Sequence, residues 1–316
     1  MATGNQEWQV ESIILGIHGL NNKPPQAQIE DWWRAAITEG LQKNCQIVNP
    51  EFHFELVYWA DLLYKYSLHD DTDFSFDPLY NSQPYRPAQS GAIKEYKDGW
   101  LDSLQRGSFD VLGKTADSLR LRFEIEILSD VLLSRLLRDL HFYYDGDRFI
   151  NNRQGQSELA RLALRRELNA AIRRHASKQM MVVAHSMGSI VAYDALRDLG
   201  QRDPDLEVPY FVTIGAPLGL PYVKTKIIQE RGYDPRVRTP SLVTERWVNF
   251  ADKRDTIAVD AHLADDYGAN RLGVQVEDDL IANDFMLRDG QPNYHKSYGY
   301  LRAPEFSRLV KEFLSR

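Results

Sequence analysis

The chain has 316 residues, of which 43% are hydrophobic and 26% are charged, proportions that are ordinary for a globular protein. Its formal net charge of −7 and its lack of a basic run argue against a nucleic-acid partner. No apolar run approaches the roughly 18 residues of a membrane span, and the first residues lack the apolar core of a signal peptide. The single cysteine, Cys45, cannot form an intrachain disulfide, so we expect a reducing, cytoplasmic setting.

Alternating apolar runs and amphipathic segments predict an α/β fold, with a mostly parallel sheet and helices on both of its faces. The chain begins with an expected strand over 12–20, a helix over 29–42 and a strand over 54–60. The later expected elements are a helix over 157–175, strands over 180–183, 208–216, 246–251 and 272–276, a Pro- and Gly-punctuated excursion over 217–244, and a closing helix over 304–314.

Between the second strand and the next regular helix lies a long segment without this alternation. It is far longer than a connection between parallel strands needs. We therefore expect residues 62–150 to be an inserted, mainly helical cap on a core domain formed by residues 1–61 and 151–316. Within it, apolar residues recur at helical spacing from Leu121 to Leu140. This stripe either packs on the core or lines a pocket for an acyl chain.

The stretch over 180–196 joins a buried strand to a helix through the sharp turn A-H-S-M-G at 184–188. Such a turn lifts a serine to the end of the strand, near the positive end of the following helix. The residues two before and two after that serine must be small, because the strand and helix backbones nearly touch there. Ala184 and Gly188 meet this requirement, which makes Ser186 the candidate nucleophile.

This turn resembles the nucleophile elbow of the α/β-hydrolase superfamily, and its leading alanine is similar to the variant found in small bacterial lipases. The resemblance implies a catalytic serine, acid and histidine in that order along the chain. Two histidines follow Ser186. His295 lies in the loop before the closing helix, where the superfamily places its base, whereas His262 lies before the last strand, so we expect His295 to be the base.

The acid is expected just after the strand over 246–251, where two aspartates lie close together. Asp255 resembles the hydrolase pattern of an aspartate followed by small and apolar residues. Asp252 is closer to the strand and could instead hold the turn by accepting hydrogen bonds from loop amides. We expect Asp255 to be the acid and keep Asp252 as the alternative.

The tetrahedral intermediate of acyl transfer needs backbone donors for its negatively charged oxygen. The H-G-x sequence His18-Gly19-Leu20 resembles the oxyanion loop of lipases, which implies the amides of Leu20 and Met187 as the two donors. Gly19 would let the backbone turn close to the substrate. His18 and His185 are expected to support the loop and the elbow without reacting themselves.

Together, these motifs and the late histidine broadly resemble bacterial lipase-type and inositol-deacylase-type hydrolases. The resemblance implies a serine hydrolase that cleaves carboxylic esters, of esterase, lipase or phospholipase type, through an acyl-enzyme. Two alternatives stay open: a thioesterase or peptidase with the same triad, and a non-catalytic binding protein on a hydrolase scaffold. The expected partner is a small-molecule or lipid ester, reached without a transmembrane segment.

We expect neither a metal ion nor a cofactor. The acidic stretch over 70–77 looks like a calcium loop but lacks the glycine and the terminal glutamate of an EF-hand, so we interpret it as a solvated loop. The sequence also contains no phosphate-binding glycine loop and no cluster of cysteine and histidine.

Overall fold

The computed structural model describes residues 11–19, 21–68, 84–88, 131–231, 236–288, 290 and 292–316. In this part of the chain, one six-stranded sheet has the order β2-β1-β5-β6-β7-β8, and all its neighbouring strands are parallel. Its strands are β1 (Ser12–Ile17), β2 (Phe54–Val57), β5 (Gln179–His185), β6 (Val208–Ile214), β7 (Val243–Ala251) and β8 (Val276–Leu280). A separate antiparallel hairpin pairs β3 (Phe149–Asn151) with β4 (Ser157–Leu159).

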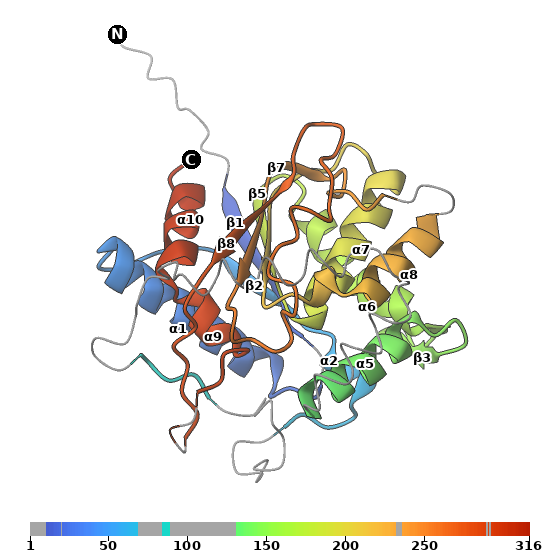
Figure 1. The fold of residues 1–316 in the computed structure, drawn as a ribbon, viewed down its shortest axis with the longest axis horizontal. Coiled ribbons are helices and arrows are strands. Elements are labelled where there is room, and N and C mark those ends of the chain that lie inside the picture. Colours follow the sequence, from blue (N-terminus) through green and yellow to red (C-terminus); the bar gives the residue numbers. More distant parts are fainter. Residues whose placement is uncertain are drawn as a thin grey trace, which may run out of the picture.

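Helices cover both faces of the six-stranded sheet (Figure 1). One face carries α1 (Gln26–Cys45), α9 (Ser297–Leu301) and α10 (Pro304–Leu314), and the other carries α5 (Val131–Tyr144), α6 (Ala160–Arg174), α7 (Met187–Arg202) and α8 (Pro221–Arg231). Alternate residues of β1 enter the two cores, with Ile13 and Leu15 packing under the second group of helices and Ile14 under the first. Strands buried on both faces are typical of a parallel α/β sheet, so the predicted fold class is confirmed.

The last strand lies further along the chain than the sequence pattern suggests: β8 begins at Val276, not at residue 272. Asn270 holds the preceding residues in a turn, because its side-chain oxygen accepts hydrogen bonds from the amides of Leu272 (2.9 Å) and Val274 (3.1 Å). The acidic sequence of β8 is accommodated because the Asp278 carboxylate accepts a hydrogen bond from the Asn249 side chain (3.0 Å). At this edge of the sheet, the position of the strand is therefore determined by satisfied hydrogen bonds and not by the apolar pattern of the sequence.

Three other boundaries also differ from expectation. The excursion over 217–244 contains the helix α8, which the sequence conceals because few of its residues, such as Val223 and Ile227, are fully buried. The helix expected from residue 157 begins only at Ala160, since the three residues before it pair with β3. The second strand ends at Val57, and a short helix, α2 (Ala60–Leu63), follows it.

The expected cap over 62–150 is described in part, and its separation from the core stays a prediction. Leu136 and Leu140 of α5 are buried in the same core cluster as residues of α6 and α7, so at these positions the stripe packs on the core. The beginning of the stripe, from Leu121, and the acidic stretch over 70–77 lie outside the described residues. Among the helices that are described, none combines the length and apolar character required to cross a membrane.

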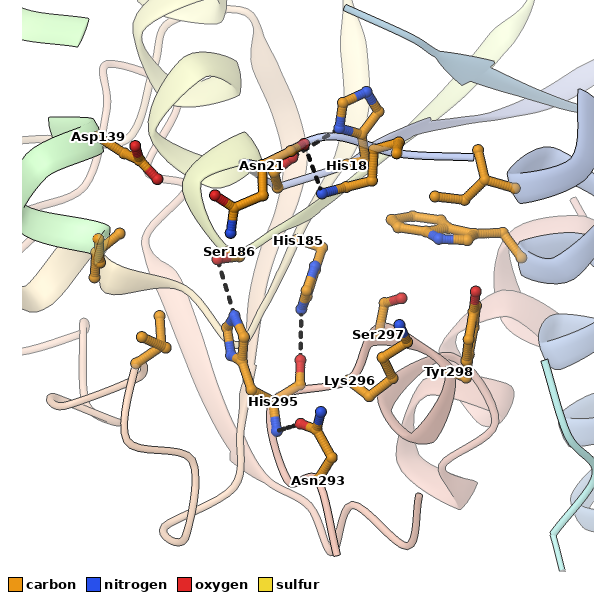
Figure 2. Close-up of a pocket in the computed structure, with 16 residues that line it drawn as sticks. His18, Asn21, Asp139, His185, Ser186, Asn293, His295, Lys296, Ser297 and Tyr298 are labelled. Atoms are coloured by element: carbon orange, nitrogen blue, oxygen red, sulfur yellow. Dashed lines mark hydrogen bonds between the residues drawn. The ribbon is translucent and has the colours of Figure 1, made fainter. Parts of the chain in front are cut away.

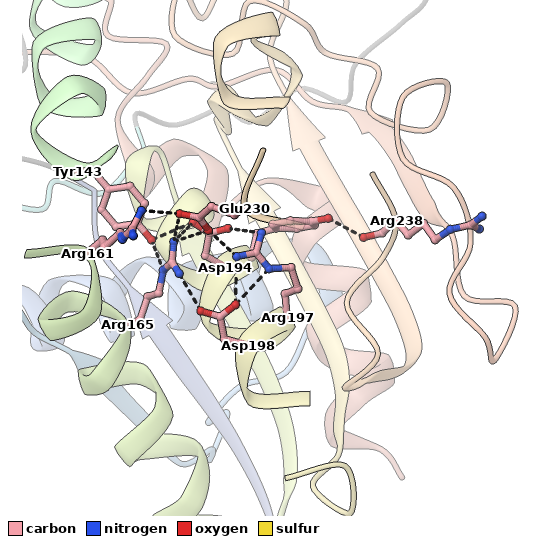
Figure 3. Close-up of polar contacts among 9 residues, drawn as sticks. Tyr143, Arg161, Arg165, Asp194, Arg197, Asp198, Glu230 and Arg238 are labelled. Carbon is pink, nitrogen blue, oxygen red and sulfur yellow. Dashed lines mark hydrogen bonds and ion pairs between the residues drawn. The ribbon is translucent and has the colours of Figure 1, made fainter. Parts of the chain in front are cut away.

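A buried cluster of charges joins four helices on the second face of the sheet (Figure 3). Its members are Tyr143 of α5, Arg161 and Arg165 of α6, Asp194, Arg197 and Asp198 of α7, and Glu230 of α8. Three guanidinium groups therefore face three carboxylates. Arg165 Nη2 lies 2.6 Å from Asp194 Oδ2, and the Tyr143 hydroxyl accepts a hydrogen bond from Arg165 Nε (2.7 Å) while donating to Asp194 (3.0 Å).

Removing the central carboxylate should be costly. Asp194→Ala leaves Arg165 and Arg197 buried with one anionic partner fewer, so we expect the free energy of unfolding to fall by about 3–5 kcal/mol. Asp203→Ala is the matched control, because Asp203 pairs with Arg173 at the surface, where both side chains are 39–50% exposed. It should cost less than about 1 kcal/mol. Urea denaturation measures both, and equal losses would show that the cluster is not a stabilising link.

Candidate active site

Ser186 occupies the sharp turn between β5 and α7. Its backbone lies in a strained region, with φ of 55° and ψ of −132°, as expected at a nucleophile elbow. A Cβ atom on Gly188 would lie only 2.5 Å from the carbonyl oxygen of His18, so no side chain fits at that position. Ala184 is fully buried between its partners on β1 and β6. The demand for small residues around the serine therefore follows from direct backbone contact.

His295 lies between Ser186 and Asp255 in a continuous chain of hydrogen bonds. The distance from Ser186 Oγ to His295 Nε2 is 2.9 Å, and His295 Nδ1 lies 2.9 and 2.8 Å from the two oxygens of Asp255. An ionised carboxylate can only accept, so Nδ1 carries the proton and Nε2 of the neutral ring accepts from the serine hydroxyl. All three side chains are buried. The structure thus brings the three predicted residues together in an orientation suited to proton transfer from the serine.

Asp255 is fixed by donors that the sequence did not reveal. Its Oδ1 accepts from the amide of Ile257 (2.9 Å), and its Oδ2 accepts from the hydroxyl of Tyr300 (2.8 Å). The same hydroxyl accepts from the amide of Asp252 (3.1 Å). Burial raises the pKa of Tyr300 well above its ordinary value, so this residue remains a donor. Tyr300 lies in α9 without any motif around it, which is why spacing did not identify it.

Asp252, the alternative acid, holds the surrounding loops. Its carboxylate accepts hydrogen bonds from the amides of Arg254 (2.9 Å) and Asn283 (2.6 Å). The side chain of Asn283 in turn donates to the carbonyl oxygens of Tyr294 (2.8 Å) and Lys296 (2.9 Å), the two residues that flank His295 in sequence. Asp252 therefore links the turn that carries Asp255 to the loop that carries His295, in the supporting role that the sequence allowed for it.

Gly215, at the end of β6, is a second feature that sequence spacing did not reveal. Its φ of +55° is readily adopted by glycine. A Cβ atom there would lie 2.8 Å from Asp255 Oδ2 and 3.3 Å from His295 Nδ1. The glycine therefore leaves the space in which the carboxylate and the imidazole meet.

The loop after β1 lies directly against the elbow. A Cβ atom on Gly19 would come within 2.8 Å of Ser186 Cβ, which explains the need for glycine. His18 supports this loop: its Nδ1 donates to the carbonyl oxygen of Gly19 (2.7 Å), and its Nε2 accepts from the amide of Trp59 (3.2 Å). Its ring also stacks on the Trp59 indole at 4.5 Å. Leu20, the expected oxyanion donor, lies outside the described residues.

Two other predicted neighbours take positions consistent with supporting the elbow. Met187 is the first residue of α7, so its amide is not used by the hydrogen-bond ladder of the helix. His185 donates from Nε2 to the carbonyl oxygen of His295 (2.8 Å), with the ring centres 4.7 Å apart. Burial lowers the pKa of His185 well below its ordinary value, so its ring is neutral and holds the loop by this bond.

Ser186 and His295 open onto a pocket with both polar and apolar walls (Figure 2). The apolar walls come from Ile29, Trp33, Leu136, Ile257 and Tyr298. Leu136 and Asp139 belong to α5, so the described end of the expected cap lines the same pocket as the serine. No cluster of three or more metal-ligating side chains occurs within the described part of the chain.

The family model "Alpha/beta hydrolase of unknown function (DUF900)" matches residues 145–225, a range that includes β5, the Ser186 turn and β6. The six-stranded parallel sheet agrees with this match. The chain is an α/β hydrolase by fold. No curated protein matches it significantly. Because this fold supports many reactions, the substrate class of this α/β hydrolase has to be argued from the site itself.

The neutral His18 of this α/β hydrolase should make its stability depend on pH. Burial, with a smaller contribution from Lys23, lowers the pKa of His18 from 6.5 to about 3. Between these values the unfolded chain binds the proton and the folded chain does not, so the free energy of unfolding rises as pH rises toward 6.5. We therefore compare the free energy of unfolding of the parent with that of a variant in which residue 18 does not titrate. The advantage of the parent should be smaller at pH 4.5 than at pH 7.5, by about 2–3 kcal/mol.

Urea denaturation of the parent and of His18→Gln at the two pH values measures this difference. His53→Gln is the control, because His53 is an exposed histidine at the surface. A His18→Gln effect that is equal at both pH values would contradict the assignment of a buried, neutral His18.

Proposed function

We propose that this α/β hydrolase is a serine hydrolase that cleaves carboxylic esters through an acyl-enzyme. The observation that carries the proposal is the continuous hydrogen-bond chain from Ser186 through His295 to Asp255 beside a pocket. A serine hydroxyl is a weak nucleophile at neutral pH and needs an adjacent base that is oriented by a third group. The contact of Ser186 with His295 and that of His295 with Asp255 support these three roles.

In the proposed reaction, Ser186 Oγ bonds to the carbonyl carbon of the ester while His295 Nε2 takes the hydroxyl proton. Asp255 stabilises the resulting imidazolium and keeps the ring oriented. The tetrahedral intermediate then loses the alcohol, which receives the proton from His295. Water, activated by the same histidine, hydrolyses the acyl-enzyme and regenerates the serine. The amide of Met187, and that of Leu20 as the sequence predicts, would bind the oxyanion.

The apolar side chains of the pocket favour a substrate with an acyl chain, because they line the same pocket as Ser186. Trp33 and Ile29 come from α1, and Leu136 comes from α5. The insertion over 62–150 would then serve as a cap that covers the acyl chain and excludes water. A thioester or amide substrate would use the same relay with a different leaving group, and a series of substrates with one acyl group separates these classes.

Ser186→Ala should reduce ester hydrolysis by about 10⁴-fold or more while the protein stays folded, because the nucleophile is lost. The measurement is turnover of p-nitrophenyl esters from short to long acyl chains. Ser189→Ala is the matched control: this buried serine on α7 donates to the carbonyl oxygen of Ala184 (3.1 Å) and does not line the pocket. It should cost stability but keep activity. Near-parental turnover by folded Ser186→Ala would refute the mechanism.

The two neighbouring aspartates should differ in their effect on turnover. Asp255→Asn should lower kcat by about 10³–10⁴-fold, because an amide cannot stabilise the imidazolium or fix the required tautomer. Asp252→Asn should lower the melting temperature, because Asp252 holds two loops, but should reduce kcat less than about tenfold. Turnover and thermal unfolding of both variants test this, and a kcat loss concentrated in the Asp252 variant would reverse the assignment.

A further inference from the structure

Asn21, two residues after Gly19, is held in an unusual conformation beside the elbow. Its backbone φ is +67°, in the left-handed region that asparagine tolerates better than most residues. The ammonium of Lys23 donates to the Asn21 carbonyl oxygen (3.1 Å). The next residue, Asn22, donates from its side chain to the carbonyl oxygen of Tyr66 (2.8 Å). These bonds hold the backbone of this loop next to the elbow.

The side-chain nitrogen of Asn21 is buried and has no hydrogen-bond partner among the described residues. An unsatisfied buried amide is costly, so such a group in a folded protein calls for an explanation. Asn21 is one of the residues that line the pocket containing Ser186 and His295. The unsatisfied donor is therefore located where a ligand would bind.

Figure 2 shows the Asn21 amide pointing toward Ser186, on the side of the serine away from His295. The serine hydroxyl is engaged with His295 at 2.9 Å. The amide does not compete for this hydroxyl, since Asn21 Nδ2 forms no bond to it. An oxygen that arrives next to Ser186 on a reacting carbonyl carbon would find this amide as a donor.

We propose that the side-chain amide of Asn21 is a further oxyanion donor, and this inference rests on the proposed serine hydrolase function. When Ser186 Oγ bonds to the carbonyl carbon, the π-electron pair of the carbonyl moves onto its oxygen. Asn21 Nδ2–H then donates to that negatively charged oxygen. When the intermediate collapses, the carbonyl re-forms, the bond to the leaving oxygen breaks, and that oxygen takes the proton from His295. Asn21 is thus a catalytic residue that backbone motifs do not identify.

Two substitutions remove the donor without straining the backbone. Asn21→Asp keeps the shape and the tolerance for positive φ but replaces the NH₂ donor with a carboxylate oxygen. Asn21→Gly removes the side chain, and glycine accepts the same φ. Asn151→Asp is the control, because it makes the same chemical change at an exposed position of β3. Asn151 does not line the pocket.

The experiment measures the second-order rate at which an alkyl fluorophosphonate labels Ser186, because this reaction develops a negative oxygen beside the serine and needs no knowledge of the natural ester. We expect both Asn21 variants to react about 100-fold more slowly than the parent, the usual effect of losing one oxyanion donor. The Asn151 variant should react at the parental rate. The melting temperature of Asn21→Gly should change little, since the side-chain nitrogen has no hydrogen bond to lose.

Parental labelling rates in both Asn21 variants would overturn this inference and leave the proposed function intact. If Ser186 of the parent were not labelled at all, the proposed function would fail, and the inference would fail with it. With p-nitrophenyl acetate, a loss in kcat at nearly constant KM supports a donor that acts on the transition state, whereas a rise in KM alone contradicts it.

Discussion

The candidate active site depends on the close approach of three backbone segments, where β1 and β5 end and α7 begins. Gly188 faces the carbonyl oxygen of His18 with no room for a side chain, and Gly19 faces Ser186 in the same way. This crowding accompanies the positive φ of Ser186, a strain on the order of 1–3 kcal/mol. The packing of the surrounding strands, which are buried on both faces, offsets this strain. A loosely packed sheet would relax the turn and withdraw the serine from His295.

The parallel sheet topology brings the candidate site residues to the same edge of the sheet. The ends of β5, β6 and β7 point to one edge of the sheet, so Ser186, Gly215 and Asp255 meet there although they are far apart in sequence. Topology alone places these groups only approximately. Hydrogen bonds from Tyr300 and through Asn283 then fix the carboxylate and the histidine loop. Directional bonds supply the fine adjustment that sheet geometry does not.

The sequence was informative wherever function imposes a local rule. Small residues around Ser186 and the order of serine, acid and histidine are such rules, and the structure brings those side chains together. Tyr300 escaped notice because it acts through a tertiary contact that leaves no pattern in its neighbours. Asn21 escaped notice because only the folded chain places it on the wall of the pocket. β8 was misplaced for a related reason: its acidic residues are satisfied by side chains and amides from distant loops, which an apolar pattern cannot register.

The helix α7 connects Ser186, the proposed nucleophile, to one wall of the pocket. Ser186 precedes its first residue, and Asp194, about two turns along, binds the hydroxyl of Tyr143 in α5. On α5, Leu136 lies about two turns from Tyr143 and lines the pocket. The charge cluster therefore helps to fix the distance between Ser186 and one wall of its pocket. Because charged hydrogen bonds are directional while apolar packing is not, this link defines where α5 sits. Under the proposed function, a loosened cluster would alter substrate selection together with stability.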